Sequence, residues 1–360
     1  MQVASSEVPS QMRAAVYRGD SIVEVEEIAT PLIGSGEILI RVEACGVCHT
    51  DLKKVEHNLL PPPRVYGHET AGVVAATGAG VKAFSPGDRV IVFHHIPCGR
   101  CFYCDRNLYA QCHVYKRVGV TAGFEPAGGG FAQYVRVMNW IVERGVEKIP
   151  DGVSFEVASF VEPVNTCLKA VEQLAPKKND VVVVMGQGPI GLIFTMLLAK
   201  RGAVVVSTDR MESRLELSKQ CGAVLPLNPL HSDIAEEARK LTHNRGADAV
   251  VVATAATGLV SQAVDCSRPG AKILLFAQTS DAERVDLSGA AICVGERTLF
   301  GSYSASVDLQ KESARLVFGG ELPLHLLVSH RLPLGRINEA FHLALHPTEE
   351  SLKIVVAPHA

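Results

Sequence analysis

Short apolar runs separated by glycine and proline residues fill the first 150 positions of the chain. Val and Ile are concentrated at 38–42, 71–74 and 89–93, and turn-forming triplets such as 61–63 (PPP) and 86–88 (PGD) lie between them. Such runs are typical of β-strands, and Gly and Pro are typical of the turns that join them. The pattern predicts a β-rich region of many short strands, a barrel or a sandwich.

The pattern changes after residue 152. A helical stretch is predicted over 155–174, and the continuous apolar run VVVV follows at 181–184. Runs of this kind belong to strands that are buried on both faces of a parallel sheet. Further apolar runs at 203–207, 249–253 and 272–276 alternate with helical segments. This alternation predicts a doubly wound parallel sheet.

The alternation ends near residue 300. A helix is expected near 337–345 and a strand near 352–356, and this tail can return to the first region. We therefore expect the α/β class and two domains. The limits are 1–157 with 298–360 for one domain, and 158–297 for the other.

Composition narrows the classes of protein. A chain of 360 residues is longer than one average domain, so two domains are expected. Its composition, with 47% hydrophobic and 20% charged residues, is typical of globular proteins. A net charge of −3 gives no reason to expect nucleic acid or an anionic membrane as a partner. The longest apolar stretch, 189–199, is shorter than the ~20 residues that cross a bilayer, and the N-terminal segment lacks the features of a signal peptide.

The ten cysteines are distributed unevenly. Without a signal peptide, they indicate a reducing compartment, so a cytoplasmic location is expected. Cys98, Cys101, Cys104 and Cys112 have spacings of two, two and seven, and four thiolates satisfy a tetrahedral zinc ion. The spacing favours a structural zinc lobe at 94–113. One alternative is an iron–sulfur cluster, but the ferredoxin pattern ends in Cys-Pro, which this sequence lacks. The other is a pair of disulfides, which a reducing compartment disfavours.

The segment after residue 180 carries a dinucleotide-binding signature. A strand is followed by Gly186, Gly188 and Gly191 in the pattern G-x-G-x-x-G, then by a helix to about residue 200 and a second strand that ends at Asp209. The glycines allow a tight turn, close approach of a pyrophosphate and close helix packing. A chance pattern in a turn is the alternative, but all parts are in register. Asp209 can bind ribose hydroxyls and favours NAD, whereas Arg210 could offset its repulsion of a 2′-phosphate, which leaves NADP as the alternative.

Three separated pieces can build a second metal site. They are Cys48, the pair His68-Glu69, and Glu162. A thiolate, an imidazole and carboxylates that leave room for water are typical of a catalytic zinc. Each piece alone is weak evidence for a metal ligand. A lone Cys is most often a small buried hydrophobic residue, and a lone His has many structural roles.

Other residues near these pieces have competing interpretations. Cys45 and Cys48 form a C-x-x-C pair, which could be a redox pair or half of a metal knuckle. His94 and His95 precede the cysteine lobe, and we interpret them as residues at the end of a strand.

Several motifs in order resemble the zinc-containing medium-chain dehydrogenases. They are GVCHTD (46–51), GHE (67–69), the four-cysteine run, GGGFAQYV (128–135), VEP (161–163) and GQGPIG (186–191). The match spans roughly residues 13 to 356. It is most similar to the polyol branch around sorbitol dehydrogenase and to threonine dehydrogenase, because Glu162-Pro163 stands where other alcohol dehydrogenases have a cysteine ligand.

The resemblance implies a GroES-like catalytic domain, a Rossmann domain and two zinc ions per chain. It implies that Cys48, His68 and Glu69 hold the catalytic zinc, with Glu162 either a direct ligand or linked through the zinc-bound water. It also implies a homodimer or homotetramer. The implied cofactor contacts are Gly186, Gly188, Pro189, Ile190, Gly191, Asp209, Arg214, Phe276 and Ser302.

Two positions depart from the family. The histidine that ends the proton relay in many relatives is Lys53 here, and an arginine of sorbitol dehydrogenase is replaced near Ser302. These departures affect the polyol assignment more than the chemistry.

The predicted reaction is hydride transfer between a secondary alcohol, with a polyol or sugar alcohol favoured, and NAD. Zinc would act as a Lewis acid on the hydroxyl, and Thr50 would accept its proton. Asp51 would orient a ligand, and His49 would contact the cofactor pyrophosphate or face solvent. Within the enzyme class, a threonine-3-dehydrogenase-like or a general secondary alcohol dehydrogenase is the alternative.

Two other classes of protein compete with this prediction. They are a nucleotide-sensing interaction protein with a zinc ribbon and a thiol–disulfide enzyme that uses Cys45 and Cys48. A zinc-free quinone reductase of the same superfamily is disfavoured, because it would not need the zinc ligands.

Overall fold

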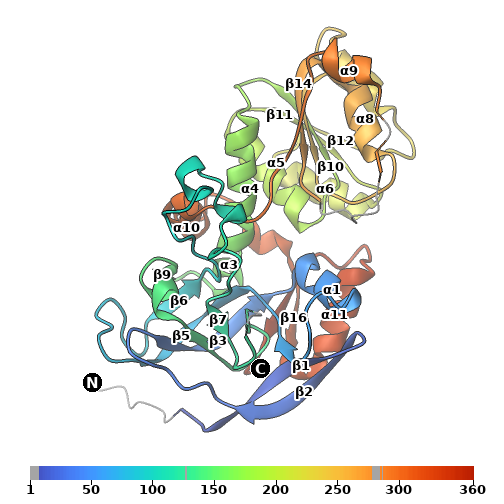
Figure 1. Ribbon diagram of the computed structural model, residues 1–360. Coiled ribbons are helices and arrows are strands. Elements are labelled where there is room, and N and C mark those ends of the chain that lie inside the picture. Colours follow the sequence, from blue (N-terminus) through green and yellow to red (C-terminus); the bar gives the residue numbers. More distant parts are fainter. Residues whose placement is uncertain (1–7, 126–127, 278–283, 286) are drawn as a thin grey trace. The chain divides into compact units, whose positions relative to one another are not determined.

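The chain folds into two compact units. A computed structural model describes residues 8–125, 128–277, 284–285 and 287–360. Unit 1 is Met1–Pro163 with Ser306–Ala360, and unit 2 is Val164–Ala305 (Figure 1). The domain limits expected from the sequence, 157/158 and 297/298, stay a prediction.

Unit 1 is built mainly from antiparallel strands. Its strands are β1 (Gln11–Gly19), β2 (Ile22–Ala29), β3 (Ile38–Gly46), β4 (Arg64–Val65), β5 (Glu69–Thr77), β6 (Arg89–Val92), β7 (Val120–Thr121), β8 (Tyr134–Val137), β9 (Val146–Lys148), β16 (Val328–Pro333) and β17 (Lys353–Ala357). The larger sheet has the order β16-β17-β3-β5-β6-β9, and β8 pairs with β3 and β7. The smaller sheet has the order β2-β1-β4. The C-terminal tail therefore returns to unit 1, where β17 pairs with β3.

Short helices connect these strands. They are α1 (His49–Glu56), α2 (Asn139–Val142), α3 (Phe155–Ala158), α10 (Gln310–Phe318) and α11 (Ile337–Leu345), with 3₁₀ turns η1 (Cys104–Arg106), η2 (Tyr109–Gln111), η3 (Val307–Leu309), η4 (Leu324–Leu327) and η5 (Leu334–Arg336). α4 (Val161–Leu174) begins in unit 1 and continues in unit 2.

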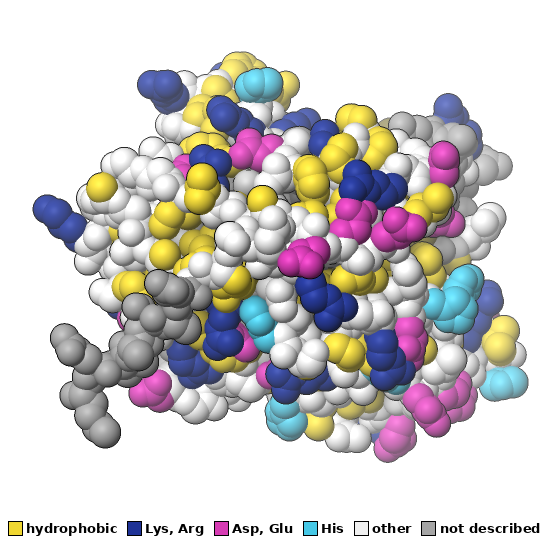
Figure 2. All heavy atoms as spheres, turned by 90° about the horizontal axis from the view of Figure 1, so that it is seen from below, with side chains coloured by type: hydrophobic (Ala, Val, Ile, Leu, Met, Phe, Trp, Pro, Cys, Tyr) yellow, Lys and Arg dark blue, Asp and Glu magenta, His cyan; other side chains and the backbone are white. Residues whose placement is uncertain are grey.

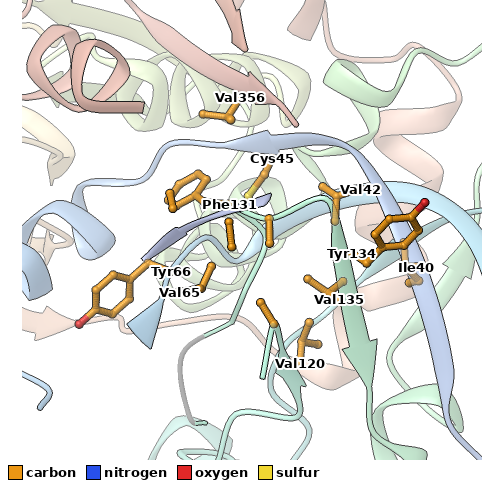
Figure 3. Packing of buried hydrophobic residues seen from close by; sticks show 14 of the residues in the cluster. Ile40, Val42, Cys45, Val65, Tyr66, Val120, Phe131, Tyr134, Val135 and Val356 are labelled. Atoms are coloured by element: carbon orange, nitrogen blue, oxygen red, sulfur yellow. The ribbon is translucent and has the colours of Figure 1, made fainter. Parts of the chain in front are cut away.

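The core of unit 1 lies between its strands. Figure 3 shows Val42 and Val135 from the paired strands β3 and β8, with Val120 from β7 and Phe131 nearby. All four side chains are at most 2% exposed. Branched side chains pack well on a pleated surface, and this explains why the Val- and Ile-rich runs form the buried strands here.

Unit 2 contains the parallel sheet that the sequence predicts. Its strands are β10 (Val181–Met185), β11 (Val204–Thr208), β12 (Leu225–Leu227), β13 (Ala247–Val252), β14 (Ser267–Leu275) and β15 (Thr298–Gly301). They follow the order β12-β11-β10-β13-β14-β15, and all neighbours are parallel. Every residue of β10 is buried, as expected for a strand covered on both faces. The α/β class and the doubly wound sheet are confirmed.

Helices cover this sheet. They are α4, α5 (Pro189–Lys200), α6 (Glu212–Gln220), α7 (Ile234–Leu241), α8 (Leu259–Cys266) and α9 (Gly289–Cys293). In Figure 1, α5 and α8 lie on opposite sides of the sheet. α5 is apolar around most of its circumference and buried from Gly191 to Leu198, which fits a helix in the interior of an α/β unit.

The helical stretch predicted over 155–174 is confirmed, but a short turn divides it. The structure has α3 and α4, separated by Ser159 and Phe160. Ser154 caps α3, since its hydroxyl accepts a hydrogen bond from the Val157 amide at 3.2 Å. Phe160 is fully buried, so packing of this ring fixes the break that periodicity alone does not reveal.

Two properties of the chain are the hydropathy of its helices and the distribution of charged side chains on its surface. Among the described residues, no helix has the length and apolar character needed to span a bilayer. On the face shown in Figure 2, basic and acidic side chains are interspersed and are not gathered by sign.

A partly buried ion pair joins Glu37, the residue before β3, to Arg136 of β8. The Arg136 guanidinium donates from Nε and Nη2 to the Glu37 carboxylate at 2.8 and 2.9 Å, and the Gly34 amide donates to the same carboxylate at 2.7 Å. Glu37 is 8% exposed. The bond to Arg136 holds the pKa of Glu37 below its usual 4.5, although burial acts in the opposite direction.

We expect Glu37→Gln to lower the free energy of unfolding by about 1–3 kcal/mol at neutral pH, because it leaves a charged group with a weaker partner. Because the folded-state pKa of Glu37 lies below 4.5, the ion pair stabilises the fold fully above that value and less as the pH falls. Urea unfolding at neutral and acid pH measures both effects. Glu26→Gln, at the more exposed pair with Arg18, is the control and should cost less than about 1 kcal/mol. A gap between wild type and Glu37→Gln that persists unchanged in acid would contradict this assignment.

Candidate functional site

Two paired strands of unit 1 bring a thiol, an imidazole and a carboxylate together. β3 ends at Gly46, which is paired with Glu69, the first residue of β5. Cys48 follows β3 and caps α1, and His68 directly precedes β5. One ligand atom from each of Cys48, His68 and Glu69 lies within 4.8 Å of the others. This spacing and this mixed donor set fit one zinc ion.

Asp51 orients His68. The His68 Nδ1 atom lies 3.0 Å from the carboxylate of Asp51, which is buried in the first turn of α1. Because Nδ1 faces Asp51, the Nε2 atom is left for an ion, as in many carboxylate–histidine–metal arrangements. Burial opposes a charged imidazole, but Asp51 and Cys48 raise the pKa of His68 well above its usual range.

Glu69 is held by Lys353. The two side chains form a buried ion pair, with Glu69 1% and Lys353 4% exposed. Gly46 leaves room for this pair, because a Cβ atom there would lie 2.0 Å from Glu69 Oε2 and 2.8 Å from Lys353 Cε. Lys353 belongs to β17 near the C-terminus and carries no local motif, so residue spacing gives no sign of its role here.

Glu162 adjoins the three converging groups but is not one of them. It occupies the first turn of α4, and its carboxylate is not among the atoms gathered within 4.8 Å in the described residues. Burial raises the pKa of Glu162 to about 7, His68 lowers it and Glu69 raises it. The carboxyl group therefore senses the charges of the cluster and can exchange a proton near neutral pH. On α1, Thr50 is half-buried and His49 is exposed.

Two further histidines lie beside this cluster. The rings of His68 and His94 have centroids 4.8 Å apart, His94 and His95 are 3.9 Å apart, and His95 lies 4.9 Å from Tyr115. Burial lowers the pKa of His94 and His95, that of His95 to about 3, so both rings are neutral. From the sequence, both histidines were expected only as residues at the end of a strand, and β6 ends at Val92, two residues before His94.

The second cluster consists of the four cysteines of the lobe. The Sγ–Sγ distances are 3.6 Å for Cys101 and Cys104, 3.7 Å for Cys98 and Cys112, and 3.9 Å for Cys98 and Cys104. All four sulfurs lie within 4.8 Å of one another. A disulfide requires about 2.05 Å, so these distances fit four ligands around one ion instead. Burial opposes a charged thiol, but hydrogen bonds from the backbone amides of Cys98 and Tyr115 and from the Cys98 and Cys104 thiols together lower the pKa of Cys112, which favours a thiolate.

Cys45 does not resemble a redox thiol. It is fully buried, and its Sγ lies 3.8 Å from the hydroxyl of Thr70. Burial raises the pKa of Cys45 well above its usual range, and Asp51 and Glu69 raise it further. A reactive cysteine needs a lowered pKa and access to solvent, so the environment disfavours a Cys45–Cys48 redox pair.

The glycine loop lies between β10 and α5 in unit 2. Gly186 has φ +93°, and a Cβ there would lie 2.7 Å from the Cβ of Thr254. A Cβ on Gly191 would lie 1.8 Å from the Gly186 carbonyl oxygen, so this glycine allows close helix packing. A Cβ on Gly188 would meet no atom within 4 Å. The loop therefore leaves open space at the N-terminus of α5, where amide groups favour a phosphate.

Asp209 follows β11 at the same edge of the sheet. Its carboxylate accepts hydrogen bonds from the amides of Gln187 at 2.6 Å and Met211 at 3.0 Å. Arg214 Nη1 lies 3.9 Å from Asp209 Oδ2, and the Arg210 side chain is exposed. The acid is thus fixed beside the glycine loop, with two basic residues nearby.

The remaining predicted cofactor residues belong to the same unit. Pro189 and Ile190 open α5, and Phe276 and Ser302 directly follow β14 and β15. Strands in a parallel sheet end at one edge, and dinucleotides bind at that edge. Phe276 packs against Phe194 of α5 with ring centroids 4.9 Å apart.

Comparisons with known proteins show the family to which the chain belongs. A family model described as an alcohol dehydrogenase GroES-like domain matches residues 34–151, and a model described as a zinc-binding dehydrogenase matches residues 189–318. The chain is 29% identical to a sorbitol dehydrogenase of Bacillus subtilis over 98% of this chain and 99% of that protein. It is 30% identical to an L-threonine 3-dehydrogenase of Pyrococcus abyssi over 89% of this chain and 91% of that protein.

Solved structures agree as well. An alcohol dehydrogenase from Thermus sp. ATN1 superposes with a TM-score of 0.82 at 29% identity, covering 96% of this chain and 99% of that one. This likeness extends over both the antiparallel unit and the parallel unit. The chain belongs to the zinc-containing medium-chain dehydrogenase family.

Proposed function

We propose that this protein is a zinc-dependent dehydrogenase that transfers hydride between a secondary alcohol, with a polyol or sugar alcohol favoured, and NAD. The observation that carries the proposal is the convergence of Cys48, His68 and Glu69 in a chain that also has a dinucleotide-binding loop. The names of the relatives, a sorbitol dehydrogenase and an L-threonine 3-dehydrogenase among them, support an alcohol as substrate. We further propose a homodimer or homotetramer located in the cytoplasm.

We assign two zinc sites. The four cysteines of the lobe hold a structural ion, because four thiolates complete a tetrahedral shell. Cys48, His68 and Glu69 hold the catalytic ion and leave one position open for substrate. Glu162, which lies outside the converging set, acts indirectly and not as a direct ligand.

Residues of the chain position the metal ligands and transfer the proton of the alcohol. A zinc ion held by Cys48, His68 and Glu69 would lower the pKa of the alcohol hydroxyl, and a nicotinamide cofactor bound at the glycine loop would accept the hydride. Asp51 holds His68 in the tautomer that offers Nε2. Thr50, two residues after Cys48 on α1, accepts the proton of the alcohol and passes its own hydroxyl proton on toward solvent, along the ribose hydroxyls of a bound cofactor. Burial raises the pKa of Glu162, so its carboxyl group can hold a proton beside the site.

Asp209 supports NAD as the preferred cofactor. The amides of Gln187 and Met211 hold its carboxylate beside the glycine loop, where it can bind ribose hydroxyls and repel a 2′-phosphate. Arg210 and Arg214 weaken that repulsion, so we expect NADP to be used less efficiently and not to be excluded.

A panel of secondary alcohols with NAD and NADP tests this function. We expect reduced cofactor to form fastest with a polyol or sugar alcohol and NAD, and a chelator to abolish turnover. Metal analysis of the same preparation should approach two zinc ions per chain. Bound cofactor without turnover of any alcohol would instead favour a nucleotide-sensing role.

The two cysteines of the C-x-x-C pair should behave differently. We expect Cys48→Ser to lower zinc content by about one ion per chain and kcat/KM by more than about 100-fold, because loss of a ligand exceeds the cost of losing an outer partner. Cys45→Ser is the matched control and should keep both metal content and activity, since Cys45 is a core residue. Loss of activity in Cys45→Ser with zinc intact would favour a thiol–disulfide enzyme.

Substitutions at two glycines of the cofactor loop should distinguish an effect on NAD binding from an effect on stability. Gly188→Ala adds a Cβ into open space, so we expect a change in unfolding free energy within about 0.5 kcal/mol and a roughly tenfold weaker affinity for NAD. Gly191→Ala places a Cβ 1.8 Å from the Gly186 carbonyl oxygen and should cost about 1–3 kcal/mol of stability or more. Thermal unfolding and cofactor titration measure both. Unchanged NAD affinity in a folded Gly188→Ala would argue against pyrophosphate binding at this loop.

A further inference from the structure

Lys353 carries a charge that the proposed mechanism does not use. It lies on β17, is 4% exposed and forms an ion pair with Glu69. Its Nζ atom also donates a hydrogen bond to the Val47 carbonyl oxygen at 3.0 Å, and it lies 5.9 Å from the ring centroid of Phe160. Buried lysines are rare unless they are paired, so this ammonium group needs its partners.

The backbone brings Lys353 to this position. β17 pairs with the end of β3, where Val355 is opposite Gly46, and the Val47 amide donates to the Ile354 carbonyl oxygen at 2.9 Å. Lys353, one residue earlier on β17, therefore lies next to the segment that leads into Cys48. Gly46 provides the space in which the ammonium group reaches Glu69.

The charges around Lys353 explain why a cation is needed there. The groups that interact with it electrostatically are acidic: Glu69, Cys48 and Glu162. Asp51 adds a further carboxylate to the cluster, through His68. A divalent ion neutralises two negative charges, and the ammonium group offsets another in an environment where unpaired charges are costly.

We propose that Lys353 is a positioning residue that holds Glu69 in the orientation required of a metal ligand. The inference rests on the proposed function, because it assumes that Cys48, His68 and Glu69 bind zinc. A carboxylate has two oxygens, so Glu69 can pair with Lys353 through Oε2 and offer the other oxygen to the ion. Asp51 does the same for His68, so each of these two ligands has its own buried partner.

Zinc release to a chelating dye tests this role without relying on turnover. In Lys353→Met, which keeps the aliphatic stem and removes the charge, we expect one of the two zinc ions to leave about 10–100-fold faster than in the wild type. The other ion, held by the cysteine lobe, should leave at the wild-type rate. Lys148→Met, at an exposed lysine paired with Asp88, is the matched control and should release both ions as the wild type does. Wild-type release from Lys353→Met would overturn the proposal.

A double-mutant cycle distinguishes positioning of Glu69 from a general effect on the fold. If Lys353 acts through Glu69, adding Lys353→Met to Glu69→Gln should change zinc release by less than about threefold, since residues that act through one contact are not additive. An equal acceleration in both backgrounds would contradict the assignment. If Lys353→Met does not fold, Lys353→Arg carries the test, because it keeps the cation. Its zinc release should stay within about threefold of the wild type, and release as fast as that of Glu69→Gln would overturn the proposal.

The wild-type protein separates this inference from the proposed function. If it binds zinc only at the cysteine lobe and a chelator leaves its turnover unchanged, the function itself fails, and the role of Lys353 fails with it. If it binds two zinc ions and the chelator stops turnover, the function stands. The release rates of the Lys353 variants then decide the positioning role alone.

Discussion

The antiparallel pairing of β3 with β5 is the constraint on which the candidate site depends. It places Gly46 opposite Glu69, so the end of one strand and the start of the other meet at one point of the sheet. Cys48 and His68 lie directly beyond these strand ends. Because side chains alternate between the faces of a strand, a shift of one residue in this register would move Glu69 to the other face and separate the three ligands.

The partners around the ligands follow from the same pairing. Asp51 reaches His68 because α1 starts immediately after Cys48, and Lys353 reaches Glu69 because β17 pairs with β3 on the side opposite β5. Gly46 lies at the centre of this arrangement, since any Cβ there would displace the Glu69–Lys353 pair. A ligand set of mixed charge is thus stabilised by groups from both ends of the chain.

Unit 2 relies on a different constraint. Parallel strands end at one edge, so the glycine loop, Asp209, Phe276 and Ser302 lie along that edge although they are distant in sequence. Local motifs predicted this unit well, because the VVVV run, the glycines and Asp209 are close together in the chain and their roles depend on local geometry. The antiparallel unit was harder to predict, because its short strands gave no information on their pairing order.

The sequence by itself determined the α/β class, the parallel sheet and the four-cysteine lobe, because each of these depends on periodicity or on short-range spacing. It named Cys48, His68 and Glu69 as candidate ligands only through motifs that resemble a known family, since these residues are distant in the chain. Only the tertiary structure decided that helix 155–174 breaks at Phe160, that Glu162 lies outside the converging set, and that His94 and Lys353 adjoin it. The physical reason is that these features arise from packing and charge pairing between segments far apart in the chain, which residue spacing does not encode.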